Sequence, residues 1–205
     1  MERPLNEYTT FVRDNESVQI IRKVLTHKEK NMSSTVRSRN SFDLPSNERG
    51  HSHISNGDLK LLSSGGVSFI DNRIISDKAN LIDRYKVIIT YAMSGGNKPG
   101  AEGNYQIISS LMVLNPKEVC TETYLIIGDF DNLEKAKNMV SYVKTKFLRF
   151  LLLQSLTSIH ITKSCFQFVP LQDFSKPWTD EELYKKYGLT DEEIQFIESM
   201  IRPME

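Results

Sequence analysis

The sequence is poor in cysteine and has no long apolar segment. Its two cysteines, Cys120 and Cys165, lie far apart and form no CxxC pair, so we expect reduced, buried thiols in a cytoplasmic protein. The longest apolar stretch, FLLLQSL, follows Arg149 and contains Gln154. It is shorter than the roughly 18 residues that a membrane helix needs. The opening segment MERPLNEYTT has no apolar signal core, so neither secretion nor a membrane partner is indicated.

The common catalytic signatures are also missing. The sequence has no Walker loop, no GxGxxG after a strand, no GxSxG and no HExxH. The loop SGGNKPGAEGN (94–104) is followed by a strand-like segment, whereas a phosphate cradle needs a helix there. His51 and His53 have no cysteine or carboxylate partner at metal-binding spacing. The single His160 is expected to be structural or solvent-facing.

A methyl-transfer site is not expected either. Adenine methyltransferases hold the target base with an Asn-Pro-Pro-aromatic motif, and the nearest match here is LNPKEV. It has Lys117 in place of the second proline. We therefore expect no methylation by this chain alone.

Charge is balanced overall but unevenly distributed. The 205 residues include 26 Lys and Arg and 26 Asp and Glu, and 39% are hydrophobic, which allows one domain with appendages or two small ones. Residues 176–205 hold 4 basic and 8 acidic residues, which leaves 22 and 18 for residues 1–175. No acidic residue lies between Glu134 and Asp173. This pattern is compatible with polyanion binding, and equally with an ordinary solvated helix face.

Hydrophobic periodicity predicts an α+β fold with a mixed or antiparallel sheet. A helix is expected at 13–30, and residues 31–56 form a polar, aperiodic excursion that predicts a long loop or a partly mobile segment. The segments 59–64 and 67–70 predict a hairpin, and 86–92, which is apolar almost throughout, predicts a strand buried on both faces. Further strands are expected at 106–116, 122–130 and 160–171. One long amphipathic helix is expected from about 131 to 156, with Lys135, Lys146 and Arg149 away from its apolar face.

The motif Thr-Asp-Glu-Glu occurs twice near the end, at 179–182 and 190–193. Paired carboxylates can serve acid–base catalysis or a metal site, but Thr-x-x-Glu is also the capping box that begins a helix. Apolar residues follow each motif at helical spacing, and Gly188 stands where a helix-ending glycine is expected. The repeat therefore predicts two short C-terminal helices and no active site.

The C-terminal segment, residues 165–204, resembles part of a known protein family. CFQFVPLQDFSKPWTDEELYKKYGLTDEEIQFIESMIRPM (165–204) resembles the C-terminal end of bacterial adenine-specific DNA methylases that are fused to, or act with, type II restriction enzymes. GGVSFIDNRII (65–75), YKVIITYA (85–92) and VCTETYLIIGDFDNLEKAKNMVSYVKTKFLRFLL (119–152) precede it in the same order, so the resemblance spans roughly 59–204.

The order of elements is also similar to target-recognition domains of type I restriction specificity subunits. In those a strand with a Thr-rich start leads to a helix rich in Tyr, Phe and Leu, and then to a strand that ends in Pro and Gln. The corresponding parts here run from Thr121 to Ile127, from Ser141 to Leu153 and from Ile161 to Gln172.

The resemblance implies a DNA target-recognition (specificity) domain at 1–175 and a helical tail at 176–205. Its partners would be double-stranded DNA and a methyltransferase or endonuclease domain or subunit of a bacterial restriction–modification system in the cytoplasm. N6-adenine methylation, its S-adenosylmethionine and any Mg²⁺ would belong to those missing domains, and this chain would hold no cofactor and have no activity when isolated.

A protein that recognises a DNA sequence needs side chains that reach base edges or phosphates. Arginine suits guanine, asparagine and glutamine suit adenine, and lysine and serine suit phosphates. Candidates occur in the polar excursion, in the glycine-rich loop, and in the predicted long helix with the strand after it. They are Arg37, Arg39 and Asn40; Ser94, Asn97, Lys98 and Asn104; and Lys144, Lys146, Arg149 and Lys163. The hypothesis is that these side chains share one face.

Two alternatives stay open. The segment GDLK offers Asp58 and Lys60, with Asp43 upstream, which would suit a metal-dependent nuclease of the same system. The other alternative is a protein–protein module whose helices after Thr179 dock on the catalytic domain.

Overall fold

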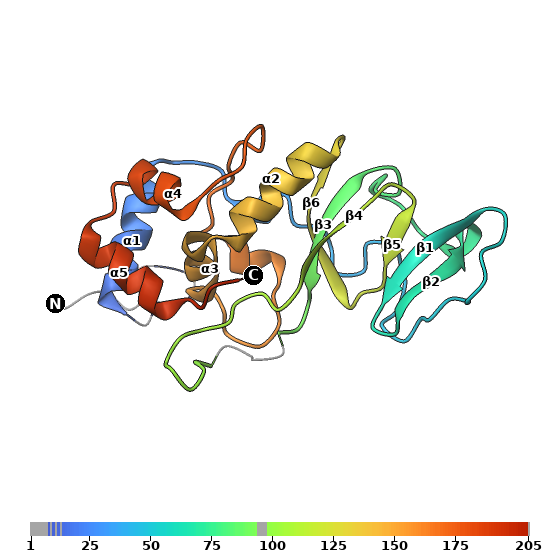
Figure 1. Ribbon diagram of the computed structural model, residues 1–205, viewed down its shortest axis with the longest axis horizontal. Coiled ribbons are helices and arrows are strands. Elements are labelled where there is room, and N and C mark those ends of the chain that lie inside the picture. The colour runs from blue at the N-terminus through green and yellow to red at the C-terminus, as the bar shows by residue number, and fades with distance from the viewer. Residues whose placement is uncertain (1–7, 9, 11, 13, 94–97, 205) are drawn as a thin grey trace.

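The computed structural model describes residues 8, 10, 12, 14–93 and 98–204. Helices gather at one end of the molecule and two small sheets occupy the other (Figure 1), which confirms the α+β class. In chain order the elements are α1 (Asn15–Thr26), η1 (Met32–Ser34), β1 (Asp58–Ser63), β2 (Gly66–Asp71), η2 (Asn72–Ile74), β3 (Tyr85–Thr90), β4 (Leu111–Leu114), β5 (Glu118–Cys120), β6 (Tyr124–Phe130), α2 (Leu133–Lys144), α3 (Lys146–Leu153), η3 (Lys163–Phe166), α4 (Asp180–Lys186) and α5 (Asp191–Met200).

The two sheets have three strands each. In the sheet β2–β1–β5, β1 pairs antiparallel with β2, as the predicted hairpin requires, and parallel with β5. The sheet β4–β3–β6 is wholly antiparallel. On β3, Ile88 packs towards the first sheet while Val87 and Ile89 pack towards the helices. The prediction that this strand is buried on both faces is confirmed.

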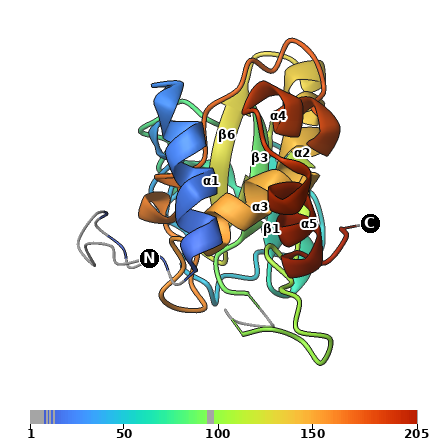
Figure 2. The same ribbon diagram turned by 90° about the vertical axis from the view of Figure 1, so that its left-hand side faces the viewer.

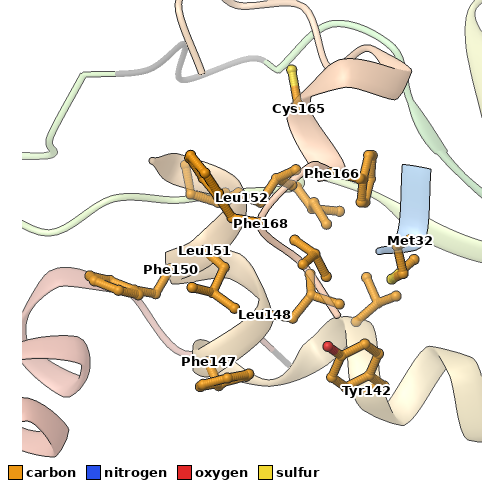
Figure 3. Close-up of a cluster of buried hydrophobic side chains, with 14 of the residues drawn as sticks. Met32, Tyr142, Phe147, Leu148, Phe150, Leu151, Leu152, Cys165, Phe166 and Phe168 are labelled. Atoms are coloured by element: carbon orange, nitrogen blue, oxygen red, sulfur yellow. The ribbon is translucent and has the colours of Figure 1, made fainter. Parts of the chain in front are cut away.

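The helices form a second, larger hydrophobic cluster on the other face of the sheet β4–β3–β6. Figure 2 shows α1, α3 and α5 in front of β3 and β6, and α2 packs directly on this sheet. The cluster is rich in aromatic rings, and Figure 3 shows Tyr142, Phe147, Phe150, Phe166 and Phe168 among leucines. Burial of this apolar surface is the main stabilising term for the helical half.

The predicted long helix is two helices. Thr145 has an extended ψ of 145° between α2 and α3, and its hydroxyl accepts a hydrogen bond from the Leu148 N–H at 3.2 Å. Met139 and Tyr142, which a single helix would place beside the basic face, have 0% exposure. The prediction failed because the chain turns at Thr145, so one helical wheel cannot describe both segments.

Two predicted strands also differ. Residues 106–116 contain only the short strand β4, and 160–171 contains the 3₁₀ turn η3 in place of a strand. The backbone around η3 bonds to several separate segments, with Ile161 N–H donating to Tyr91 and Leu171 N–H donating to Lys30. Because no single partner strand runs alongside, alternating apolar residues there do not form a ladder.

The polar excursion at 31–56 is a loop, as predicted, but much of it is packed. Phe42 and Leu44 are 1% and 2% exposed and belong to the cluster between the sheets. The Arg37 N–H donates to the Ile126 carbonyl at 2.9 Å, and the Ser76 N–H donates to the Phe42 carbonyl at 3.2 Å. These contacts hold the segment against the edge strand β6 and against the loop that contains Ser76.

Both predicted capping boxes are present. Thr179 accepts from the Glu182 N–H at the start of α4, and Thr190 accepts from the Glu193 N–H at 3.4 Å at the start of α5. Gly188 has a φ of +60°, the left-handed conformation that glycine adopts readily just after a helix. The acidic repeat thus begins two helices, as predicted.

Asp180 of the first repeat has a further role that the sequence did not show. Its carboxylate accepts from the Lys146 N–H at 3.0 Å and the Phe147 N–H at 2.8 Å, so it caps α3 as well. Burial raises the pKa of Asp180. The acidic tail is therefore joined to the helical core at a helix N-terminus.

The tail helices bury their apolar residues within this chain. Leu183 and Tyr187 of α4, and Ile197 of α5, lie in the same cluster as α1, α2 and α3. Ile194, Phe196 and Met200 of α5 are only partly buried, so the docking-module alternative stays a prediction.

Thr190→Ala should lower the free energy of unfolding by about 1 kcal/mol, because it removes the oxygen that caps α5. Thr190→Ser keeps that oxygen and should stay within a few tenths of the parent. Urea denaturation followed by circular dichroism measures both variants. An alanine variant as stable as the parent would mean that the box contributes nothing to the fold.

Lys86 is fully buried on β3. Its ammonium donates to four backbone carbonyls, those of Leu81, Ile82, Arg84 and Asn115, at 2.8 to 3.3 Å. Burial lowers the pKa of Lys86 to about 8, so the amine stays mainly protonated at pH 7. This lysine therefore ties the loop before β3 to the turn after β4.

Candidate nucleic-acid interface

A polar groove of about 420 Å³ lies where the excursion meets two other loops. Residues from three separate parts of the chain line it, and most are polar or basic. They are Val36, Arg37, Ser38, Asn40, Ser41, Asp43, Ser76, Lys78, Ala79 and Lys163. Arg37, Asn40 and Lys163 were predicted from the sequence as DNA-contacting residues, and the structure brings these three together.

Arg37 is held in place by an acidic partner outside the groove lining. Its Nε donates to Asp129 Oδ1 at 2.8 Å, and Arg84 Nε lies 3.3 Å from the other oxygen of the same carboxylate. The Arg37 side chain keeps 40% exposure. A guanidinium that is oriented and still exposed can contact a base edge or a phosphate without first losing much conformational freedom.

Asn40 and Asp43 supply an amide and a carboxylate to the groove. The Asn40 amide donates to Asp43 Oδ1 at 3.3 Å, and both residues are exposed. Asp43 is in the left-handed region at φ 57°. Amide and carboxylate groups of this kind can accept from, or donate to, the amino and ring nitrogens of bases.

Lys78 and Lys163 are the two cations of the groove with no partner. Both are exposed, and within the described part of the chain neither ammonium takes part in a hydrogen bond or an ion pair. Lys163 begins η3, and Lys78 lies in the loop before β3. Two free ammonium groups in one groove favour a ligand with several negative charges.

Beside the groove, three planar side chains stack. The Arg39 guanidinium lies 4.2 Å from the centre of the Tyr91 ring, and the His160 ring is stacked on Tyr91 at 4.8 Å with an interplanar angle of 22°. We call this the Arg39–Tyr91–His160 stack. Arg39 follows Ser38 of the groove, and His160 stands shortly before Lys163, so the stack and the groove share two loops.

A search of known protein families and of curated proteins found no match. The interpretation of this surface consequently depends on its geometry and on the resemblance described above.

Two of the predicted residues of the glycine-rich loop, Lys98 and Asn104, do not join the groove lining. Ser94 and Asn97 lie outside the described residues. Lys98 is exposed. Asn104 accepts from Arg202 Nε at 3.2 Å and donates to Glu102, so its amide connects this loop to the end of the chain.

The three DNA-contacting residues predicted on the long helix, Lys144, Lys146 and Arg149, have different environments in the structure. Lys144 is exposed on α2, while the Lys146 ammonium pairs with Glu198 of α5. Arg149 is only 2% exposed, and its guanidinium donates to the carbonyls of Lys144, Thr145 and Arg202. The prediction of Arg149 as a surface contact needs correction, because the turn at Thr145 rotates this side chain into the protein.

The nuclease alternative gains no support from the geometry. Asp58 accepts from His51 Nε2 at 2.7 Å and from the Ser55 N–H at 2.6 Å, and the His51 hydrogen bond holds the pKa of Asp58 below its usual value. Lys60 pairs with Glu118 at 2.8 Å. Among the residues that the structure describes, no group of three or more His, Cys, Asp or Glu side chains could hold a metal ion.

The sequence analysis missed residues of the groove and of the neighbouring Arg39–Tyr91–His160 stack. Lys78 and Ser76 lie in a short polar loop with no motif, and Tyr91 was assigned only to a buried strand. His160 was expected to be structural or solvent-facing, and it is indeed exposed, but its stacking on Tyr91 depends on a bridge between Ala92 and His160. No local signal marks such a contact, because its partners lie far apart in the chain.

Both cysteines are buried and free, as predicted. Burial raises the pKa of Cys120 to about 12, so this thiol stays protonated. Within the described ranges, no helix has the length and apolar character required to cross a membrane.

Proposed function

We propose that this chain binds double-stranded DNA through the basic groove and recognises a short target sequence for an adenine methyltransferase or restriction enzyme. The observation that carries the proposal is the meeting of Arg37, Asn40 and Lys163 with the unpartnered Lys78 in one groove. Catalysis would belong to a separate domain or subunit.

The groove contains the two kinds of contact that sequence recognition requires. Lys78 and Lys163 supply mobile positive charges, which suit phosphates. Arg37 and Asn40 supply donors and acceptors in more restrained positions, which suit base edges. The serines Ser38, Ser41 and Ser76 add hydroxyl groups around them.

The resemblance to target-recognition domains supports the same proposal. The segments that carry it, 119–152 and 165–204, fold into β6, α2, α3, η3 and the tail helices. The groove uses the start of η3 and loops beside β6. Of the groove lining, Ser76, Lys78, Ala79 and Lys163 lie within 59–204, the range of the resemblance, and Lys163 also lies in the part from Ile161 to Gln172. The lining residues between Val36 and Asp43 lie outside that range.

Binding to duplex DNA should weaken steeply with salt. If the three cationic side chains of the groove, Arg37, Lys78 and Lys163, each displace a counterion, affinity should fall roughly 40-fold between 50 and 200 mM salt. Fluorescence anisotropy with a randomised duplex library measures this dependence, and repeated selection from the library tests for an enriched target sequence.

Failure to retain any duplex at low salt would overturn the proposal. Salt-dependent binding without enrichment of any sequence would contradict target recognition and leave only general affinity for a polyanion. Cleavage of the library in Mg²⁺ by this chain, abolished in Asp58→Ala, would favour the nuclease alternative.

A further inference from the structure

The Arg39–Tyr91–His160 stack is anchored by the backbone on both sides of Tyr91. The Tyr91 N–H donates to the Thr123 carbonyl at 2.9 Å, and the Tyr91 carbonyl accepts from the Ile161 N–H at 2.8 Å. The second of these bonds places His160 against the tyrosine ring. The stack is thus fixed by the ends of β3 and of the loop before η3.

Arg39 is held on the same ring by a carboxylate. Its Nη2 lies 3.6 Å from Glu122 Oε2, and its Nε donates to the Glu122 carbonyl at 3.4 Å. The Arg39 side chain nevertheless keeps 47% exposure. A guanidinium plane in this position extends the flat surface of the ring beneath it.

His160 is the exposed end of the stack. Its imidazole contacts Tyr91, and in the described part of the chain its ring nitrogens take part in no hydrogen bond. The stacked rings also contribute little to the interior, since Tyr91 and His160 belong to neither hydrophobic cluster among the described residues. A rigid, exposed aromatic stack outside the core provides a flat surface for another π system.

We propose that the Arg39–Tyr91–His160 stack receives an unpaired nucleobase of the DNA whose backbone lies in the groove. The groove supplies the charges for the flanking phosphates, and the stack supplies a face for a base that has left the duplex. Stacking of this kind is tolerant of base identity, because every base has a π face. The inference rests on the proposed function, and it adds that DNA with an unpaired base should bind more tightly than a fully paired duplex.

The test compares the selected duplex with versions that carry one extrahelical 2-aminopurine, moved stepwise through the target. Wild-type protein should bind the best-placed bulged duplex roughly 10-fold more tightly than the paired one, the order of magnitude expected for one base stacked on an aromatic group. The 2-aminopurine fluorescence should be quenched on binding at that position and not at distant ones.

His160→Ala and His160→Phe form a matched pair of variants. The alanine variant should lose most of the preference and the quenching, whereas the phenylalanine variant should keep both because it retains a stacking ring. For each variant the affinity for the bulged duplex is divided by the affinity for the paired duplex, so a change common to both duplexes cancels. Thermal melting checks that both variants fold like the parent.

The outcomes separate this inference from the proposed function. Equal affinity for paired and bulged duplexes would overturn the inference alone, as would equal losses in the alanine and phenylalanine variants. Binding of neither duplex by the wild-type protein would overturn both.

Discussion

Replacing Lys78 and Lys163 together by glutamine should weaken duplex binding roughly 60-fold in 0.1 M salt. These two ammonium groups line one groove and have no intramolecular partner among the described residues. Each phosphate that such a group neutralises contributes about 0.9 to the slope of log affinity against log salt. A variant that lacks two of them and binds as the parent does at about 1 M salt therefore binds roughly 60-fold more weakly at 0.1 M. The slope itself should fall by about 1.8. Anisotropy titrations at several salt concentrations measure both effects.

The control removes the same charge elsewhere. Lys28 and Lys185 are exposed and do not line the groove, so the double variant Lys28→Gln and Lys185→Gln should bind within about two-fold of the parent and keep nearly the whole slope. Equal losses in the two double variants would mean that net charge, and not the groove, governs binding.

Arg37 cannot serve this test equally well. Its guanidinium pairs with Asp129, which also lies close to Arg84. Removing Arg37 would therefore change the local fold and the interface together. The two lysines allow a cleaner measurement because their loss leaves no buried charge unpaired.

Replacing Arg149 by methionine should lower the free energy of unfolding by about 3 to 4 kcal/mol. The guanidinium is buried, and burial lowers its pKa to about 10, so it remains charged at neutral pH. It supplies donors to the carbonyls of Lys144 at 2.9 Å, Thr145 at 3.2 Å and Arg202 at 2.6 Å. The Thr145 carbonyl keeps a bond from the backbone N–H of residue 149. Methionine fills part of the volume but leaves the carbonyls of Lys144 and Arg202 without the guanidinium donors, which costs about 1 to 3 kcal/mol for each buried group left unsatisfied.

Urea denaturation measures the loss, and Lys144→Met is the matched control. Lys144 is exposed on α2, so its replacement should change stability by less than about 0.5 kcal/mol. The folded fraction of the Arg149 variant should bind duplex DNA as the parent does. A stable Arg149 variant that has lost DNA affinity would contradict its structural role and restore it as a contact residue.

Helices and strands that are specified by a short local sequence pattern were predicted well. The hairpin β1–β2, the buried strand β3, the strand β6 and the helices after Thr179 and Thr190 all occur where the sequence indicated. Each is specified by side chains within a few positions of one another: a glycine turn, a run of β-branched residues, or a capping box. Local chemistry of this kind acts in the same way whatever the rest of the chain does.

The candidate interface was only partly predictable. Arg37, Asn40 and Lys163 could be selected by residue type, and they do meet in the groove, whereas Arg39 lies over Tyr91 beside it. Lys78, Tyr91 and His160 could not be selected, because their significance depends on neighbours that are distant in the chain. Arg149 was misplaced for the same reason, since a one-residue break at Thr145 changed the direction in which it points.

The sequence by itself determined the α+β class, the helix starts of the acidic repeat and the burial of both cysteines. These follow from periodicity, capping and side-chain hydrophobicity, which operate over short distances. Only the tertiary structure decided which charged groups remain free. It paired Lys146 and Arg37 with carboxylates, enclosed Lys86 and Arg149 among carbonyls, and left Lys78 and Lys163 open in one groove. The physical reason is that packing of the apolar core sets the position of each helix and strand. Those positions decide whether a charged side chain lies beside an opposite charge, beside backbone carbonyls or in solvent.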